Sequence, residues 1–217
     1  MTKWGISCRW IEVGRGGGPP GSLVKKASRV VPDPEYFKRK VNVVPLVYPH
    51  QTLDSTRTSW HITFGTYGAR LHGDDRPTVD KQYNQPGEDF VAASPRRKQF
   101  EREKMKFPPR YFTLEQRKFV EVQLPAICVR GGWSYRICAG GADHVHLLCD
   151  IRKEIHGEKV RRLVKRWVGQ ALSERWPLKQ GESWWADEGS NIAIHDNSYL
   201  NNAFAYIARQ RATLFEE

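Results

Sequence analysis

The sequence predicts an α+β fold of the ferredoxin-like βαββαβ plan, in which an antiparallel sheet carries helices on one face and a further helix is appended at the C-terminal end. Three observations lead to this prediction. A β-branched and aromatic run begins at Trp60, two apolar runs within residues 134–151 are joined by a short turn, and residues 156–176 have clear helical periodicity.

Residues 1–57 are predicted to form a basic N-terminal extension of the domain that follows, residues 58–217. The extension has ten Lys and Arg residues against four Asp and Glu residues, so a quarter of the chain holds +6 of the net charge of +11. A Gly- and Pro-rich stretch at 14–21 and prolines in the apolar run 41–49 favour an extended segment over an independent core.

The predicted domain begins with a strand in the run WHITFGTYG, residues 60–68. A polar insertion of about residues 68–112 follows, and we expect one short helix within it. Thr113 is a suitable N-cap for the next helix, and Pro125 is expected to end that helix after residue 124.

The runs SYRICA and HVHLLCDI, joined by the turn-forming residues 140–143, predict a β-hairpin. The next segment, residues 156–176, has one apolar stripe at helical spacing and ends before Pro177. This segment is therefore predicted to be an amphipathic helix that packs on the sheet.

Residues 184–195 predict one or two short strands, which complete the sheet. Asp196 or Asn197 is expected to cap a last helix over residues 198–211. This helix is the one appended to the βαββαβ plan.

The composition excludes several classes of protein. No apolar run approaches the roughly 20 residues that a membrane helix needs, and the N-terminal segment lacks the apolar centre of a signal peptide, so we expect a cytoplasmic protein. The four cysteines form no CxxC pair, so buried thiols are expected rather than a zinc ribbon. These cysteines are Cys8, Cys128, Cys138 and Cys149.

The charge of the chain, 35 Lys and Arg residues against 24 Asp and Glu residues, favours nucleic acid as a partner. Lys and Arg gain affinity for phosphates by releasing counterions, although a solvated basic surface would carry the same charge. The choice between nucleic-acid binding and a solvated surface depends on which candidate catalytic or metal-binding residues lie near the basic ones.

A pair of histidines is the first candidate for that chemistry. His144 and His146 lie two residues apart in a predicted strand, so both side chains point to one face of the sheet. Two imidazoles at this spacing can bind one divalent ion. The alternative is a pair of partly exposed or hydrogen-bonded structural histidines.

The last predicted helix supplies a second pair. Tyr206 and Gln210 are four residues apart and so share one side of the helix, beside its apolar face. Taken alone, Tyr206 is as expected for a structural tyrosine at the margin of a core.

Together these motifs resemble a known family. The order DHVHLL, basic helix, short strand and YIARQ resembles the single-tyrosine HUH endonucleases and, more narrowly, the REP-associated tyrosine transposases. The strand WHITFGTYG and the turn with Leu71, His72 and Gly73 are also similar to that family. The resemblance spans about residues 60–211.

The resemblance implies a function and a site. It implies that His144 and His146 bind Mg²⁺ or Mn²⁺ with Gln210 as a third ligand, and that Tyr206 is the nucleophile. The activity implied is cleavage of single-stranded, hairpin-forming DNA through a covalent 5′-phosphotyrosine, followed by strand transfer. A monomer or homodimer associated with the bacterial nucleoid is expected.

Basic residues beside this site are expected to contact DNA phosphates. On the helix 156–176 they are Lys159, Arg161, Arg162, Lys165 and Arg166, and in the extension they are Lys38, Arg39 and Lys40. For the helix, the alternative is a solvated basic face.

Three other functions are alternatives to a transposase. A domesticated DNA-binding protein would bind DNA without cleaving it, and a replication initiator or relaxase would use the same HUH chemistry at a different DNA site. An unrelated HxH metallohydrolase is disfavoured, because the chain is too short for a TIM barrel and has helices that an all-β cupin lacks.

Overall fold

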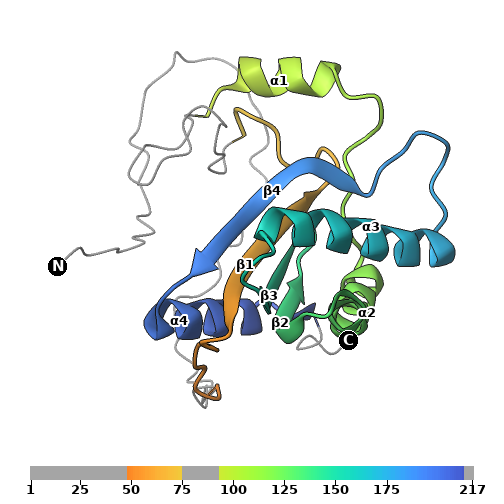
Figure 1. Ribbon diagram of the computed structural model, residues 1–217. Helices are drawn as coiled ribbons and strands as arrows, with labels where there is room; N and C mark the ends of the chain where they lie inside the picture. The colour runs from red at the N-terminus through yellow and green to blue at the C-terminus, as the bar shows by residue number, and fades with distance from the viewer. Residues whose placement is uncertain (1–47, 75–92, 213–217) are drawn as a thin grey trace, which may run out of the picture. The chain divides into compact units, whose positions relative to one another are not determined.

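The computed structural model describes residues 48–74 and 93–212. Its sheet has the order β2-β3-β1-β4, and every pair of neighbouring strands is antiparallel (Figure 1). The strands are β1 (Arg57–Thr66), β2 (Ser134–Gly140), β3 (His144–Arg152) and β4 (Trp185–Ile194). This order and these directions confirm the predicted ferredoxin-like α+β fold.

Helices cover both faces of the sheet (Figure 1). On one face, α2 (Leu114–Gly131) and α3 (Gly157–Arg175) pack on the larger core, which includes Phe64 and Leu147. The appended helix α4 (Asn197–Ala208) covers the opposite face, where Leu200 and Ile207 contact a smaller apolar cluster. The sheet is thus the middle one of three layers.

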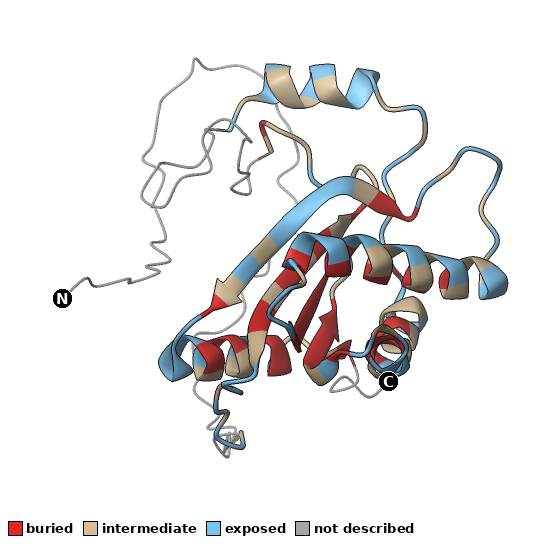
Figure 2. Cartoon of the chain, viewed as in Figure 1, coloured by how far each residue is buried: buried red, intermediate tan, exposed pale blue. Residues whose placement is uncertain are grey.

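Alternation along the strands assigns side chains to the two cores. In β1, for example, Trp60, Ile62 and Phe64 are buried toward α2 and α3. Figure 2 shows burial concentrated on the strands and on the sheet-facing sides of the helices, whereas the middle of β4 is exposed. The exposed stretch of β4 follows from its sequence, ADEGS, which has few apolar residues.

Helix α2 does not end at Pro125, so that prediction was wrong. Thr113 caps the helix as expected, in a capping box with Gln116, but the helix continues to Gly131. Proline has no N–H to donate to the carbonyl of Glu121 four residues earlier, and the Cys138 thiol contacts that oxygen at 3.6 Å instead. Burial of the following turn against the sheet keeps the helix intact.

The insertion contains the short helix α1 (Pro95–Glu103), as predicted, and its residues 75–92 lie outside the described part. Cys128, Cys138 and Cys149 are buried free thiols, whereas Cys8 lies outside the described residues. None of the described helices is long and apolar enough to cross a bilayer.

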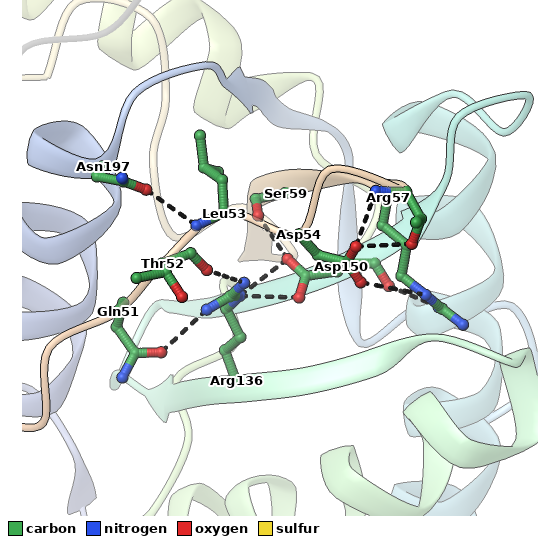
Figure 3. A network of polar contacts seen from close by, with 10 residues as sticks. Gln51, Thr52, Leu53, Asp54, Arg57, Ser59, Arg136, Asp150 and Asn197 are labelled. Carbon is green, nitrogen blue, oxygen red and sulfur yellow. Dashed lines mark hydrogen bonds and ion pairs between the residues drawn. The ribbon is translucent and has the colours of Figure 1, made fainter.

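A polar network ties the segment before β1 to α4 and the sheet (Figure 3). Arg136 of β2 donates to both carboxylate oxygens of Asp150, at 2.8 and 2.9 Å, and also to Gln51 and the carbonyl of Thr52. The backbone of Gln51 exchanges two 2.8 Å hydrogen bonds with the Asn201 side chain of α4. The N-terminal half of α4 is therefore held to the sheet partly through residues 51–53.

Candidate functional site

The two histidines of β3 lie on the face of the sheet that α4 covers. Val145 and Leu147, which alternate with them, are fully buried in the opposite core. This is the arrangement expected from the period of a strand. The apolar pair anchors β3 and leaves both imidazoles on the same side.

Tyr206 lies beside this pair. Its ring centroid is 5.4 Å from that of His146, and the centroids of His144 and His146 are 4.6 Å apart, both in edge-to-face arrangements. The Tyr206 side chain remains open to solvent, since the residue is 47% exposed, whereas His146 is 6% exposed. The structure thus brings Tyr206 and the HxH pair together within one chain.

A third histidine, His61 of β1, belongs to the same cluster and was not among the predicted site residues. Its Nε2 is 3.1 Å from Nδ1 of His146, and the hydroxyl of Thr63 is 2.9 Å from the same nitrogen. The register of β1 with β3 places Thr63 directly opposite His146. The alternation of polar and apolar residues in WHITF could have indicated that His61 and Thr63 face away from the main core.

Burial keeps two of these imidazoles neutral. Desolvation lowers the pKa of His61 to about 4. It also lowers the pKa of His146 to about 2, with a further contribution from the neighbouring His144 and His61. Both values lie well below the usual histidine pKa, so both rings are uncharged at neutral pH.

The Nε2 atom of His146 is buried and has no hydrogen-bond partner among the described residues. The other ring nitrogen, Nδ1, already contacts Thr63 and His61. A neutral imidazole whose Nδ1 carries the proton has a lone pair on Nε2, which is the form that binds metals. The surroundings of His146 therefore fit a metal ligand.

His144 has a different partner. Its Nδ1 is 2.5 Å from an Asp143 oxygen, and the other Asp143 oxygen accepts from Nε of Arg70 at 3.2 Å. The hydrogen bond with His144 and, to a lesser extent, Arg70 hold the pKa of Asp143 well below its usual range. A carboxylate on one nitrogen orients the ring and leaves the other nitrogen for a metal, an arrangement common among metal-binding histidines.

Gln210 lies just beyond α4, which ends at Ala208 rather than continuing to residue 211 as predicted. The chain tightens there, because the N–H of Gln210 bonds to the Ile207 carbonyl three residues back at 2.9 Å. Among the described residues, no hydrogen bond joins the Gln210 side chain to His144 or His146. Gln210 is only four residues after Tyr206, but α4 ends between them. Helical geometry therefore does not place their two side chains on the same side of the helix.

A group of three His, Cys, Asp or Glu side chains placed for a metal is absent from the described part of the chain. His61 does not provide a third ligand of this kind, since its Nε2 faces Nδ1 of His146. A metal bound by His144 and His146 would therefore need another type of ligand, such as the amide of Gln210, or water and phosphate oxygens.

The basic residues of α3 fall into two groups. Lys159, Arg162 and Arg166 are exposed, as expected. Arg161 is buried, at 7% exposure, and Lys165 is half-buried and donates to the carbonyls of Ala186 and Asp187. Packing against β4 therefore buries Arg161 and partly covers Lys165, two of the five residues expected to contact phosphates.

The other predicted DNA contacts were in the N-terminal extension. Lys38, Arg39 and Lys40 lie outside the described residues. The exposed cations of α3 are Lys159, Arg162 and Arg166. They do not lie directly beside the histidines as expected, because α3 packs on the opposite face of the sheet.

Comparison with solved structures found eight chains that match this one. No family model matches the sequence, and no curated protein matches it. The structure is similar to the crystal structure of a candidate transposase from Deinococcus radiodurans R1, with a TM-score of 0.39 and 14% sequence identity, over 76% of this chain and 98% of that chain. At this identity the likeness concerns the fold alone.

Proposed function

We propose that this chain is a metal-dependent single-strand DNA endonuclease and strand transferase of the HUH tyrosine type, acting on hairpin-forming DNA. The observation that carries the proposal is the contact between His146 and Tyr206, whose ring centroids are 5.4 Å apart although 60 positions separate them in sequence. The resemblance of DHVHLL and YIARQ to the REP-associated tyrosine transposases supports the same chemistry.

In this proposal His144 and His146 hold Mg²⁺ or Mn²⁺, with the amide of Gln210 as a third ligand. Two observations support this assignment: Nε2 of His146 is buried and has no partner in the described part of the chain, and a carboxylate lies on Nδ1 of His144. When bound, the ion would offset the negative charge of the scissile phosphate and polarise one of its oxygens. Neutral nitrogen and amide ligands would leave the charge of the ion undiminished.

Tyr206 is the proposed nucleophile. Its phenolic oxygen attacks the phosphorus, the bond between phosphorus and the 3′-oxygen breaks, and the 5′-phosphate becomes joined to the tyrosine. Because Tyr206 is 47% exposed, its phenolic proton can pass to water, and the released 3′-oxygen takes up a proton to form a hydroxyl. Reversal of this step with a different 3′-hydroxyl would transfer the strand.

The covalent intermediate can be tested directly. Wild-type protein incubated with 3′-labelled single-stranded hairpin DNA and Mn²⁺ is expected to give a labelled adduct that survives denaturing electrophoresis, whereas a 5′ label should appear on a released, shorter fragment. Tyr206→Phe removes only the attacking oxygen and should give none. Tyr199→Phe is the matched control, because Tyr199 is an exposed tyrosine on the same helix and should retain the adduct.

An adduct that persists in Tyr206→Phe would contradict the assignment of the nucleophile. Absence of cleavage by the wild type with every divalent ion, together with retained DNA affinity, would instead support a non-cleaving DNA-binding protein. Cleavage of a plasmid origin in preference to hairpin ends would favour a replication initiator or relaxase.

The exposed cations of α3 lead to a second prediction. Replacing Lys159, Arg162 and Arg166 together with glutamine should weaken binding of single-stranded DNA and reduce the slope of log K against log salt by about 2, if each contacts one phosphate. Fluorescence anisotropy at several salt concentrations would measure both.

The matched control for this experiment removes three cations near the other end of α3. They are Arg175, which pairs with Glu115 at the start of α2, Lys179, which follows α3, and Lys118 of α2, the neighbour of Phe119, whose ring packs on Trp176. An equal loss of slope in the control variant would show that the effect depends on net charge rather than on a local DNA contact.

A further inference from the structure

A buried carboxylate lies where α2, the hairpin and the chain after α4 meet. Glu121 of α2 is 2% exposed, and its Oε1 accepts two backbone hydrogen bonds. One comes from the N–H of Gly140 at 2.8 Å and the other from the N–H of Ala212 at 2.6 Å. A single side-chain atom thus joins three parts of the fold.

The Gly140 bond connects Glu121 to the histidine-bearing hairpin. Gly140 is the last residue of β2 and pairs with Val145, which lies between His144 and His146. Its carbonyl accepts from Nε of Arg117, also on α2, at 2.6 Å. A Cβ at Gly140 would lie 2.8 Å from the Arg117 carbonyl, so glycine permits this close approach of hairpin and helix.

The Ala212 bond connects Glu121 to the tyrosine-bearing segment. Ala212 is two residues after Gln210 and six after Tyr206, and it is fully buried. The adjacent Arg211 adds an ion pair, with its Nε 3.7 Å from the other Glu121 oxygen. Since α4 has ended at Ala208, these bonds hold the chain where helical hydrogen bonds no longer do.

Helix α4 is attached to the rest of the domain near both of its ends, and Glu121 provides the attachment at the C-terminal end. The N-terminal half of the helix is held to the segment before β1 by Asn197, which accepts from the N–H of Leu53 (Figure 3), and by Asn201, which donates to the Gln51 carbonyl. Glu121 holds the C-terminal end, from which Tyr206 reaches His146. Charge-assisted hydrogen bonds of a buried carboxylate are stronger and more directional than neutral ones, which suits a fixed attachment.

We propose that Glu121 is a positioning residue, which sets the C-terminal end of α4 with Tyr206, and the residues just after it with Gln210, against the two histidines of β3. It touches neither DNA nor metal in this role and acts through the backbone of Gly140 and Ala212. The expected effect on DNA cleavage rests on the proposed function. The expected effect on the contact between His146 and Tyr206 does not depend on that function.

Two variants separate this role from general stability. Glu121→Ala removes the shared acceptor, whereas Ala212→Pro removes the N–H on the tyrosine side and leaves the Gly140 bond to Glu121 in place. Leu124→Ala is the control, because Leu124 is fully buried one turn along α2. It packs in the larger core, on the face of the sheet away from α4. All are compared at a temperature where each remains folded, as monitored by circular dichroism.

The first measurement is Mn²⁺-dependent cleavage of labelled hairpin DNA. Glu121→Ala and Ala212→Pro should lower kcat by up to about 100-fold, the loss typical of an ångström-scale misplacement of a reacting group, and leave KM nearly unchanged. Leu124→Ala should retain the wild-type kcat. A wild-type kcat in Glu121→Ala or in Ala212→Pro would overturn the proposal. If Glu121→Ala does not fold, the kcat of Ala212→Pro is the deciding measurement.

The second measurement does not depend on cleavage. The nuclear Overhauser effect between the rings of His146 and Tyr206, recorded without DNA or metal, should be lost in both test variants and retained in Leu124→Ala. Retention in the test variants would overturn the positioning role. If the wild type cleaves no DNA, the proposed function fails, but this ring contact still decides whether Glu121 positions Tyr206.

Discussion

His146→Asn is expected to abolish detectable DNA cleavage and to lower Mn²⁺ affinity by at least about 100-fold, since changes to partners of metal-binding histidines alone cost 10- to 100-fold. The asparagine amide can still contact Thr63, which is 2.9 Å from Nδ1 in the wild type. It has no atom in place of Nε2, the buried nitrogen that lacks a partner among the described residues. Isothermal titration with Mn²⁺ and the hairpin-cleavage assay would measure the two effects.

The matched variant is His146→Gln, whose longer side chain can carry an oxygen near the position of Nε2. It should retain part of the Mn²⁺ affinity, although less than the wild type, because glutamine loses the contacts of Thr63 and His61 with Nδ1 that orient the ring. Wild-type Mn²⁺ affinity in folded His146→Asn would contradict the assignment of His146 as a ligand. Thermal unfolding of both variants would show that the comparison concerns folded protein.

Arg136→Met is expected to have the largest effect on stability, a decrease of about 3–5 kcal/mol in the free energy of unfolding. The pair with Asp150 is largely buried, with side chains 12% and 7% exposed, so methionine would leave a carboxylate in the core without its cation. The two hydrogen bonds from Arg136 to residues 51 and 52 would be lost as well (Figure 3). Urea denaturation would measure the change from the midpoint and slope.

The double variant Arg136→Met/Asp150→Asn tests the cause of this loss. Asparagine carries no charge and its amide oxygen can still accept the 2.5 Å hydrogen bond from Ser59, so part of the lost stability should return. Further destabilisation in the double variant would show that the cost comes from lost hydrogen bonds and packing rather than from the isolated charge.

Local patterns predicted most of the elements. The helix expected at 156–176 is found as α3 (Gly157–Arg175), and the hairpin of SYRICA and HVHLLCDI is found as β2 and β3. Asp196 caps the last helix through a hydrogen bond to the N–H of Tyr199. These elements were predictable because periodicity, turn residues and caps act over a few neighbouring positions.

The errors arose where distant residues override local preference. Pro125 is tolerated inside α2 because the following turn is buried on the sheet and Cys138 contacts the carbonyl that proline leaves without its helical donor. The early end of α4 accompanies the bond between Ala212 and Glu121, residues 91 positions apart. No local pattern contains such partners.

For the candidate site, the two-residue period of a strand was enough to predict that His144 and His146 share a face of β3. The sequence did not predict that Tyr206 lies beside His146, that His61 joins the cluster or that Arg161 is buried. The physical reason is that these relations depend on strand register and on the packing of helices across the sheet. Both are set by contacts between residues far apart in the chain.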